Sequence, residues 1–183
     1  TADPPAPAGT EVLVRVRAAG LNRADLLQAR GLYPPPAGVS PNIPGLEFAG
    51  EVEALGSGVS EWRVGDRVFG ITAGEAQAQY LLIDERHLAR VPERLSFTEA
   101  AAVPEAFITA FDSIITQAGL AAGETLLIHA VGSGVGLAAL QIAKSSGARV
   151  IGTSRTEGKL AACREYGLDA GIVTAEPIFA AAV

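Results

Sequence analysis

Sulfur-containing and aromatic residues are scarce in this chain. Its 183 residues include no methionine and one cysteine, and aromatic residues make up 5%. The lone cysteine, Cys163, cannot form a disulfide within the chain, and a cysteine-rich zinc module is excluded. We expect Cys163 to be an inert, buried side chain. A chain without methionine does not begin at a translation start, so we expect a piece of a longer protein, incomplete at both ends.

Charged residues are also few, and their balance is acidic. They account for 19% of the chain, against ~25% in an average globular protein. The formal net charge is −6, whereas nucleic-acid surfaces need an excess of Lys and Arg, so no nucleic-acid partner is expected. Apolar residues make up 49%, enough for a sizeable core. The low cysteine content is typical of a reducing compartment, and we expect a cytoplasmic protein.

Long hydrophobic runs are missing as well. The longest uncharged stretch, from Thr125 to Ala143, is interrupted in its middle by Gly132, Gly134 and Gly136. A strand, a tight turn and a helix of a soluble domain explain this pattern better than a membrane span. No membrane partner is therefore expected.

Residues 1–103 have the pattern of short strands. Apolar and polar residues alternate from Glu11 to Ala18, which predicts a half-buried strand. Asn22 is placed to cap a short helix through Ala29. Further strands are expected at 45–55, 64–71 and 78–83. Together they predict a small, partly open β-barrel.

The periodicity changes near Ser96. Ser96 and Glu99 have the spacing of a capping box, and helical periodicity follows as far as Gly119. We therefore assign residues 104–183 to a second domain with a connecting helix over 104–119. Its expected elements are strands at 125–130, 149–153 and 171–173 and helices at 134–146 and 154–167. This is the first half of a doubly wound nucleotide-binding fold, and residues 174–183 are not expected to continue it.

Two details of this second domain are predicted separately. The apolar run at 125–130 lacks alternation, as a strand covered on both faces requires. Ser154 and Glu157 have the spacing of a second capping box, opening the helix that follows the second strand.

A glycine-rich loop at 129–136 joins the first of these strands to the next helix. A diphosphate bound at a helix N-terminus needs small residues there, so that backbone N–H groups can approach it. The register departs from the dinucleotide fingerprint, because Val131 and Ser133 replace two glycines when the motif ends at Gly136. A nucleotide site and a ligand-free glycine-rich crossover both stay open.

The end of the second strand carries no carboxylate. NAD sites use Asp or Glu there to bind the ribose hydroxyls. Here Thr153, Ser154 and Arg155 follow one another, with Lys159 one turn into the helix. Hydroxyls and two cations suit the 2′-phosphate of NADPH, which we predict as the cofactor. Alternatively, Arg155 and Lys159 are solvated surface cations.

Six short segments carry a family resemblance. They are Ala19 to Leu26, Arg30 to Pro34, Gly45 to Gly50, Gln77 to Tyr80, Pro104 to Ala106 together with Thr109 and Ala110, and Ile128 to Gly136. Through them the chain resembles the zinc-free quinone oxidoreductases of the medium-chain dehydrogenase/reductase superfamily, with the closest likeness to the p53-inducible branch. The resemblance implies a mixed α/β protein: a GroES-like β-barrel followed by an incomplete Rossmann domain, with substrate and nicotinamide meeting in the cleft between them.

The resemblance also implies roles for particular residues. Asn22 and Tyr33 are the expected catalytic residues and line that cleft. Asn22 is also expected to bind the cofactor, and Thr109 would contact its nicotinamide end. Ser133, Gly134 and Val135 would hold the diphosphate. Two simpler interpretations stay open: Tyr33 covers the Pro34–Pro36 run, and Thr109 bonds back to its own helix.

The same resemblance bears on metal and activity. Zinc-dependent relatives have a cysteine at the position of Asn22 and a histidine at that of Leu46, so no metal is expected. The implied activity is NADPH-dependent reduction of a quinone or activated enone, with a homodimer in the full-length protein. An enoyl reductase of fatty-acid or polyketide synthesis and a non-catalytic, crystallin-like NADPH-binding protein are the alternatives.

Overall fold

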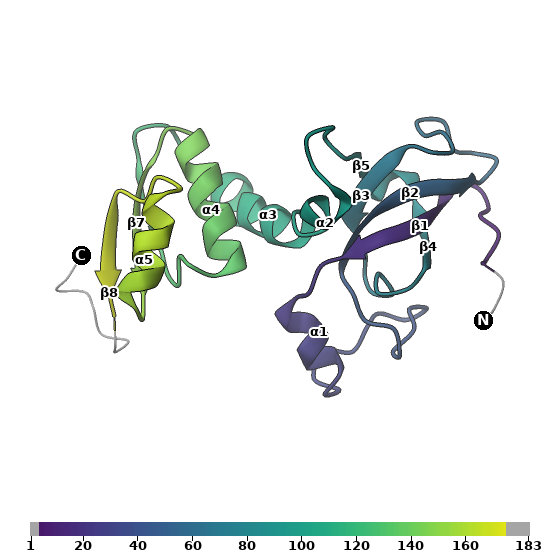
Figure 1. Cartoon of the computed structure of the whole chain (residues 1–183), viewed down its shortest axis with the longest axis horizontal. Helices are drawn as coiled ribbons and strands as arrows, with labels where there is room; N and C mark the ends of the chain where they lie inside the picture. The colour runs from purple at the N-terminus through teal and green to yellow at the C-terminus, as the bar shows by residue number, and fades with distance from the viewer. Residues whose placement is uncertain (1–3, 175–183) are drawn as a thin grey trace. The chain divides into compact units, whose positions relative to one another are not determined.

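The computed structural model describes residues 4–174. The chain divides into two compact units, one ending at Glu105 and one beginning at Ala106 (Figure 1). The sequence pattern places this boundary at 103/104. The expectation for the tail after Thr174 lies outside the described residues. In the described part, no helix has the length and apolarity needed to cross a membrane.

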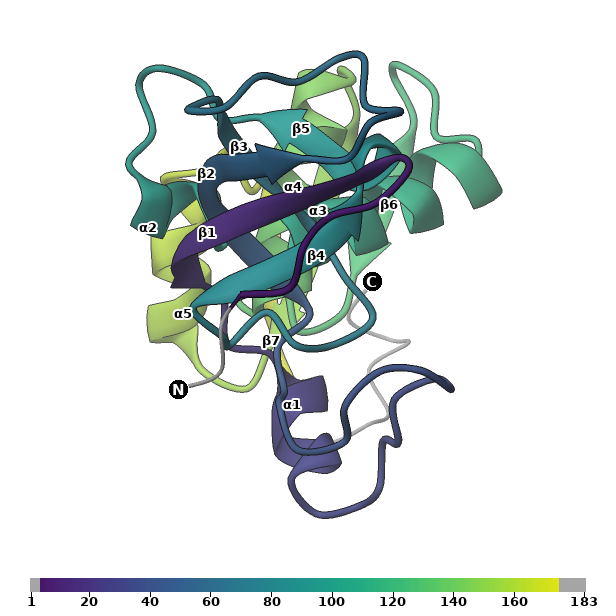
Figure 2. The ribbon, with the colours of Figure 1, turned by 90° about the vertical axis from the view of Figure 1, so that its right-hand side faces the viewer.

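Unit 1 is built on one antiparallel sheet with the strand order β4-β1-β2-β3-β5 (Figure 2). Its strands are β1 (Glu11–Ala19), β2 (Glu47–Leu55), β3 (Arg67–Ile71), β4 (Tyr80–Asp84) and β5 (Leu88–Arg90). Valines of β1 and β2 pack with Phe48, Trp62 and Leu81 in its core. The alternation expected in β1 is interrupted, because Leu13 is buried beside Val12 and the register with β2 shifts after Leu13.

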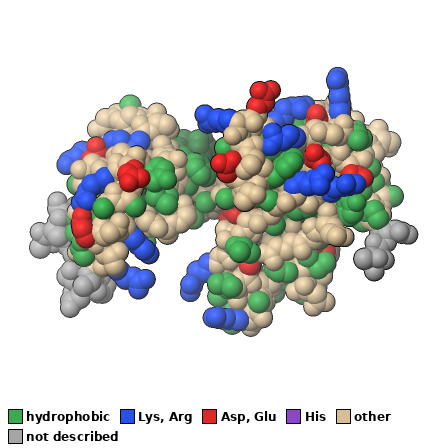
Figure 3. Space-filling model, viewed as in Figure 1, with side chains coloured by type: hydrophobic (Ala, Val, Ile, Leu, Met, Phe, Trp, Pro, Cys, Tyr) green, Lys and Arg blue, Asp and Glu red, His purple; other side chains and the backbone are tan. Residues whose placement is uncertain are grey.

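Unit 1 also contains short helical segments. They are α1 (Arg23–Gln28), η1 (Glu85–His87), α2 (Phe97–Ala100) and the start of α3 (Pro104–Phe111). The capping box at Ser96 is present: Ser96 N–H donates to the Glu99 carboxylate at 2.8 Å and Glu99 N–H to Ser96 Oγ at 3.3 Å. On the outer side of the sheet Arg15 pairs with Glu53, and Figure 3 shows basic and acidic side chains side by side over this unit.

Unit 2 contains a parallel sheet with the order β6-β7-β8, which confirms the mixed α/β class and the partial Rossmann domain. Its elements are the π-helical turn η2 (Asp112–Gln117), β6 (Thr125–Ile128), α4 (Gly134–Ser145), β7 (Arg149–Ser154), α5 (Glu157–Arg164) and β8 (Ala170–Val173). Helix α4 packs on β6 and β7, and α5 packs on β7 and β8. Leu140, Val150 and Leu160 are fully buried between these layers.

Two expectations for unit 2 are wrong. In the described residues β6 pairs with β7 alone, and Thr125 and Leu127 are exposed rather than covered on both faces. Ser154 does not cap α5, because it is still the last residue of β7 and the chain needs two more residues to turn into the helix. The N-cap is Thr156, and the Glu157 carboxylate pairs with Arg164 at 2.7 Å.

Candidate cofactor and substrate pockets

The glycine loop turns the chain from β6 into α4. It begins at Ala130, whose φ of 51° lies in the left-handed region that L-residues rarely adopt. Gly136 is required for packing, since a Cβ there would lie 2.6 Å from the Ala130 carbonyl oxygen. Ser133 is the N-cap, and its Oγ accepts the Gly136 N–H at 3.1 Å. The Ser133 hydroxyl hydrogen and the N–H groups of Gly134 and Val135 are therefore available to an anion.

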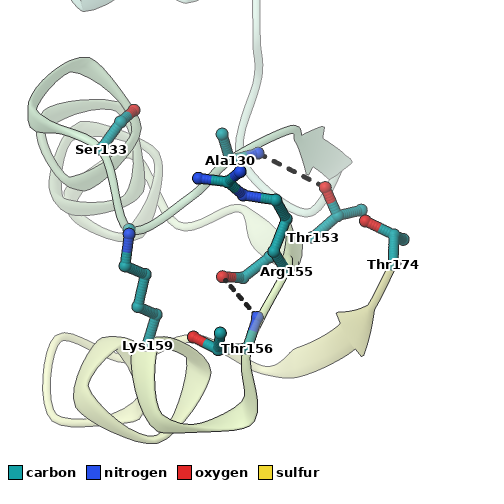
Figure 4. Close-up of a pocket in the computed structure, with 9 residues that line it drawn as sticks. Ala130, Ser133, Thr153, Arg155, Thr156, Lys159 and Thr174 are labelled. Carbon is teal, nitrogen blue, oxygen red and sulfur yellow. Dashed lines mark hydrogen bonds between the residues drawn. The ribbon is translucent and has the colours of Figure 1, made fainter. Parts of the chain in front are cut away.

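A cavity of about 560 Å³ lies beside this loop in unit 2. We call it the loop pocket; its lining residues are Ala130, Gly132, Ser133, Thr153, Ser154, Arg155, Thr156, Lys159 and Thr174 (Figure 4). The glycine loop, the end of β7 and the start of α5 thus contribute to one site. Thr174 also reaches the pocket, because β8 pairs in parallel with β7 and the Thr174 N–H donates to the Ser154 carbonyl oxygen at 2.9 Å.

Two cations, Arg155 and Lys159, line the loop pocket. Arg155 and Lys159 extend toward the glycine loop in Figure 4, and neither forms an ion pair within the described residues. Elsewhere in unit 2, Lys144 pairs with Asp169 at 2.8 Å and Arg164 pairs with Glu157. No Asp or Glu is among the lining residues that the structure describes. Its electrostatics therefore favour an anionic ligand.

The two hydroxyl residues at the end of β7 are buried and hold the pocket together. Thr153 Oγ1 lies 3.4 Å from the Ala130 N–H nitrogen and 3.2 Å from His129 Nδ1. Ser154 Oγ accepts the Thr156 N–H at 3.4 Å. Thr153 thus joins the ends of β6 and β7, and Ser154 supports the turn into α5.

These residues fit a dinucleotide. A Cβ on Gly134 would meet no protein atom within 4 Å, so the start of α4 is open to a ligand. Ser133 and the helix N-terminus suit the diphosphate, and Arg155 and Lys159 suit a further phosphate group. Val135 lies outside the loop pocket, on a cavity of about 230 Å³ near Leu127.

Thr109 is not brought to the loop pocket. It is exposed on α3 and lines none of the cavities described here, while its carbonyl oxygen accepts the Ser113 hydroxyl at 2.8 Å. A role for Thr109 at the nicotinamide stays a prediction.

Unit 1 has a cavity of its own, of about 490 Å³. We call it the proline-loop pocket; it is lined by Leu32, Tyr33, Pro34, Pro36, Leu46, Ile71, Thr72, Ala73 and Glu105. The lining is largely apolar, with the Tyr33 and Thr72 hydroxyls and the Glu105 carboxyl as its polar side-chain groups. Tyr33 is 47% exposed, so its ring and O–H are accessible to a bound molecule. A flat apolar compound with a carbonyl oxygen suits this pocket.

Asn22 lies outside the pocket lining, within a hydrogen-bond network. Its side-chain amide donates to Glu47 Oε1 at 2.8 Å, and its backbone N–H donates to Asp25 Oδ2 at 2.8 Å. Glu47 Oε2 accepts the Glu105 N–H at 2.9 Å, and Asp25 Oδ1 accepts the Gly45 N–H at 3.2 Å. Asp25 and Glu47 are both buried. Asn22 is thereby held in one orientation.

Glu105 is a pocket residue to which sequence reasoning assigned no role. Burial raises the pKa of its carboxyl, and the nearby charges of Glu47 and Asp25 raise this pKa further. The motif Pro104-Glu105-Ala106 is part of the family resemblance, but its pattern does not predict that Glu105 lies next to Tyr33 or Glu47. The fold of unit 1 places them together: Glu47 at the start of β2 accepts the Glu105 N–H, and Tyr33 and Glu105 line the same pocket.

Within residues 4–174, no three His, Cys, Asp or Glu side chains are grouped so that they could hold a metal ion. Cys163 is buried in the core of unit 2, and burial raises the pKa of its thiol. That environment disfavours the reactive thiolate.

Two family descriptions match the chain. Residues 8–112 match the alcohol dehydrogenase GroES-like domain, and residues 134–181 match the zinc-binding dehydrogenase family.

Similar proteins include both synthases and reductases. The chain is 43% identical over 90% of its length to the pikromycin polyketide synthase component PikAII of Streptomyces venezuelae, covering 4% of that protein. It is 37% identical over 84% of its length to quinone oxidoreductase of Homo sapiens, covering 46% of it. It therefore spans about half of the quinone oxidoreductase and a small part of the synthase.

Two solved structures have the same fold. The CurK enoyl reductase matches with a TM-score of 0.86 and 32% identity, covering 94% of this chain and 54% of that one. Mycobacterial Rv1454c complexed with NADPH matches with a TM-score of 0.84 and 31% identity, covering 96% and 54%.

Proposed function

The chain belongs to the alcohol dehydrogenase GroES-like family of the medium-chain dehydrogenase/reductase superfamily, and we propose that it binds NADPH and reduces a quinone or an activated enone. The superfamily comprises oxidoreductases that use a nicotinamide cofactor, and the similar Rv1454c structure contains NADPH. The observation that carries the cofactor proposal is the loop pocket, whose described lining includes Arg155 and Lys159 and no Asp or Glu. NAD sites use an acidic residue to bind the free ribose 2′-hydroxyl.

The loop pocket would hold the cofactor through complementary groups. Ser133 and the first turn of α4 would bind the diphosphate. The planar guanidinium of Arg155 would bind the 2′-phosphate with two parallel hydrogen bonds, and Lys159 would add a point charge. When bound, the reduced nicotinamide supplies a hydride, and the protein supplies its position and a water-poor surrounding.

The proline-loop pocket would hold the substrate. A quinone or enone accepts a hydride without losing a proton first, so its oxygen needs a hydrogen-bond donor rather than a Lewis acid. Tyr33 offers that donor and an aromatic face. We include independence from zinc in the proposal, because Asn22 and Leu46 are not zinc ligands. The meeting of substrate and nicotinamide between the two domains stays a prediction.

Substrate class is tested by comparing two acceptors. Steady-state kcat/KM is measured with NADPH for a soluble benzoquinone and for a short enoyl thioester. A higher value for the quinone is expected. The enoyl thioester is the second candidate, favoured by the higher identity to PikAII and the match to CurK. Binding of NADPH without turnover of either acceptor would contradict an enzymatic function and favour the crystallin-like alternative.

Metal independence is tested by chelation. Exhaustive dialysis against a chelator is expected to leave quinone reduction unchanged, because no step of the proposal needs a Lewis acid. Activity is measured before dialysis, after it, and after addition of zinc. Activity that falls on chelation and returns with zinc would contradict the proposal.

A further inference from the structure

The Glu105 carboxyl is one of the few polar groups in the wall of the proline-loop pocket. It lines the proline-loop pocket together with Tyr33, in a wall that is otherwise mostly apolar. These two side chains are the ionisable groups among the described lining residues. No donor of the described residues reaches the Glu105 carboxyl, so it is available to a bound molecule.

The surroundings of Glu105 differ from those of two neighbouring carboxyl groups. Asp25 and Glu47 each accept N–H donors on both carboxyl oxygens, whereas the Glu105 carboxyl accepts none from the described residues. Their negative charges face Glu105, whose pKa is raised by its own burial, by Glu47 and by Asp25. Lys and Arg are absent from the described lining of the pocket, so no cation offsets this effect.

We propose that Glu105 is the general acid of the reduction, donating its carboxyl proton to the substrate oxygen in the proline-loop pocket. This inference rests on the proposed function. It adds a catalytic residue to the reaction and assigns the oxygen of the acceptor to the Glu105 side of the pocket.

The step balances in protons and electrons. Hydride addition to the electrophilic carbon of an enone moves the π electron pair to the carbonyl oxygen, giving an enolate. An O–H bond then forms on that oxygen as the Glu105 O–H bond breaks, giving an enol that tautomerises to the saturated ketone in water. A quinone that gains one hydride and one proton in the same way gives the hydroquinone. The substrate gains two electrons from NADPH, and the Glu105 carboxylate regains its proton from water.

The first test measures the proton on Glu105 without any cofactor. Carbon-13 NMR of protein labelled at the glutamate carboxyl is recorded over a pH series for the unsubstituted protein and for Glu105→Gln. We expect one resonance that titrates at higher pH than the surface glutamates and that is absent from the variant. Titration of Glu105 together with the surface glutamates would overturn the proposal.

The second test uses the pH profile of the reaction. The kcat for the better acceptor should fall as the pH rises through the pKa of Glu105. Glu105→Gln should lower kcat by about 10²-fold or more, in the range of general-acid contributions, and its kcat should no longer fall at high pH. Glu105→Asp should recover part of the rate and keep the fall of kcat at high pH.

A matched control removes a carboxylate elsewhere in unit 1. Glu93 is exposed, and Glu93→Gln should leave both the rate and the profile unchanged. If the unsubstituted protein is active and Glu105→Gln keeps its rate and profile, Glu105 is not the acid while the proposed function stands. If the unsubstituted protein reduces neither acceptor, both proposals fail together.

Discussion

The two pockets recognise their ligands by different means. The loop pocket combines the backbone of a glycine loop and a helix N-terminus with two cations, and most of its lining comes from the consecutive segments β6 to α5. The proline-loop pocket is a side-chain site, and its lining comes from residues 32–36, from the start of β2, from the end of β3 and from α3. A backbone site of the first kind leaves a local sequence signature, whereas a side-chain site of the second kind leaves none. Substitutions in each pocket therefore test recognition by backbone groups and recognition by side chains separately.

The strongest expected effect comes from a side chain added to the glycine loop. Gly136→Ala would place a Cβ within 2.6–2.8 Å of backbone atoms of Ala130 and Val131. Such overpacking costs about 1–3 kcal/mol, so we expect lower stability of unit 2 and loss of NADPH binding. Chemical denaturation and fluorescence titration measure the two effects.

Gly158→Ala is the control for the glycine loop. A Cβ at Gly158 in α5 would meet nothing within 4 Å, and alanine is the better helix former by ~1 kcal/mol. Stability should rise slightly while NADPH affinity is retained. Unimpaired binding by Gly136→Ala would show that the loop does not hold the cofactor through its backbone.

The next effect concerns the two cations of the loop pocket. NADPH should bind at least about tenfold more tightly than NADH, a difference of ~1.4 kcal/mol. Arg155→Ala and Lys159→Met should each weaken NADPH binding by roughly tenfold or more, since a hydrogen bond to a charged group contributes ~1.5–3 kcal/mol, and should leave NADH binding unchanged.

Arg164→Ala provides the comparison on the same helix. Arg164 pairs with Glu157 on the surface and is absent from the pocket lining, so its removal should change neither affinity. Equal affinities of the unsubstituted protein for NADH and NADPH would contradict the assignment of the phosphate to Arg155 and Lys159.

The smallest effect is a pH dependence of stability in unit 1. Because the pKa of Glu105 is raised in the folded protein, the native state binds more protons than the unfolded state between the two pKa values. The free energy of unfolding therefore falls as the pH rises through this interval. Glu105→Gln should remove this loss and stabilise the protein above it.

The size of that change is limited by the position of Glu105. Its carboxyl is partly exposed to water, which screens its neighbours, so we expect about half a kcal/mol or less. Urea denaturation at a series of pH values measures the difference between the two proteins. Parallel stability curves for the two proteins would show that Glu105 carries the same charge when folded and unfolded.

The sequence predicts the elements of both units well where the signal is local. The strands of β1 and β7, the helix from Gly134 and the capping box at Ser96 follow from periodicity and from residue types only a few positions apart. The errors occur where a local pattern competes with pairing or chain geometry. Ser154 has the spacing of a cap but is occupied as the end of β7, and β6 is apolar although one face of it is exposed.

The sequence alone determined the fold class, the glycine loop and the two cations that follow β7, because each of these is encoded by residues close together along the chain. The tertiary structure decided which groups share a pocket. It brought Thr174 to the end of β7 through parallel pairing, and it brought Glu105 beside Asp25 and Glu47, where the Glu105 N–H donates to the Glu47 carboxylate. A raised pKa depends on burial and on charges that lie far away in sequence, and no pattern of adjacent residues encodes either of them.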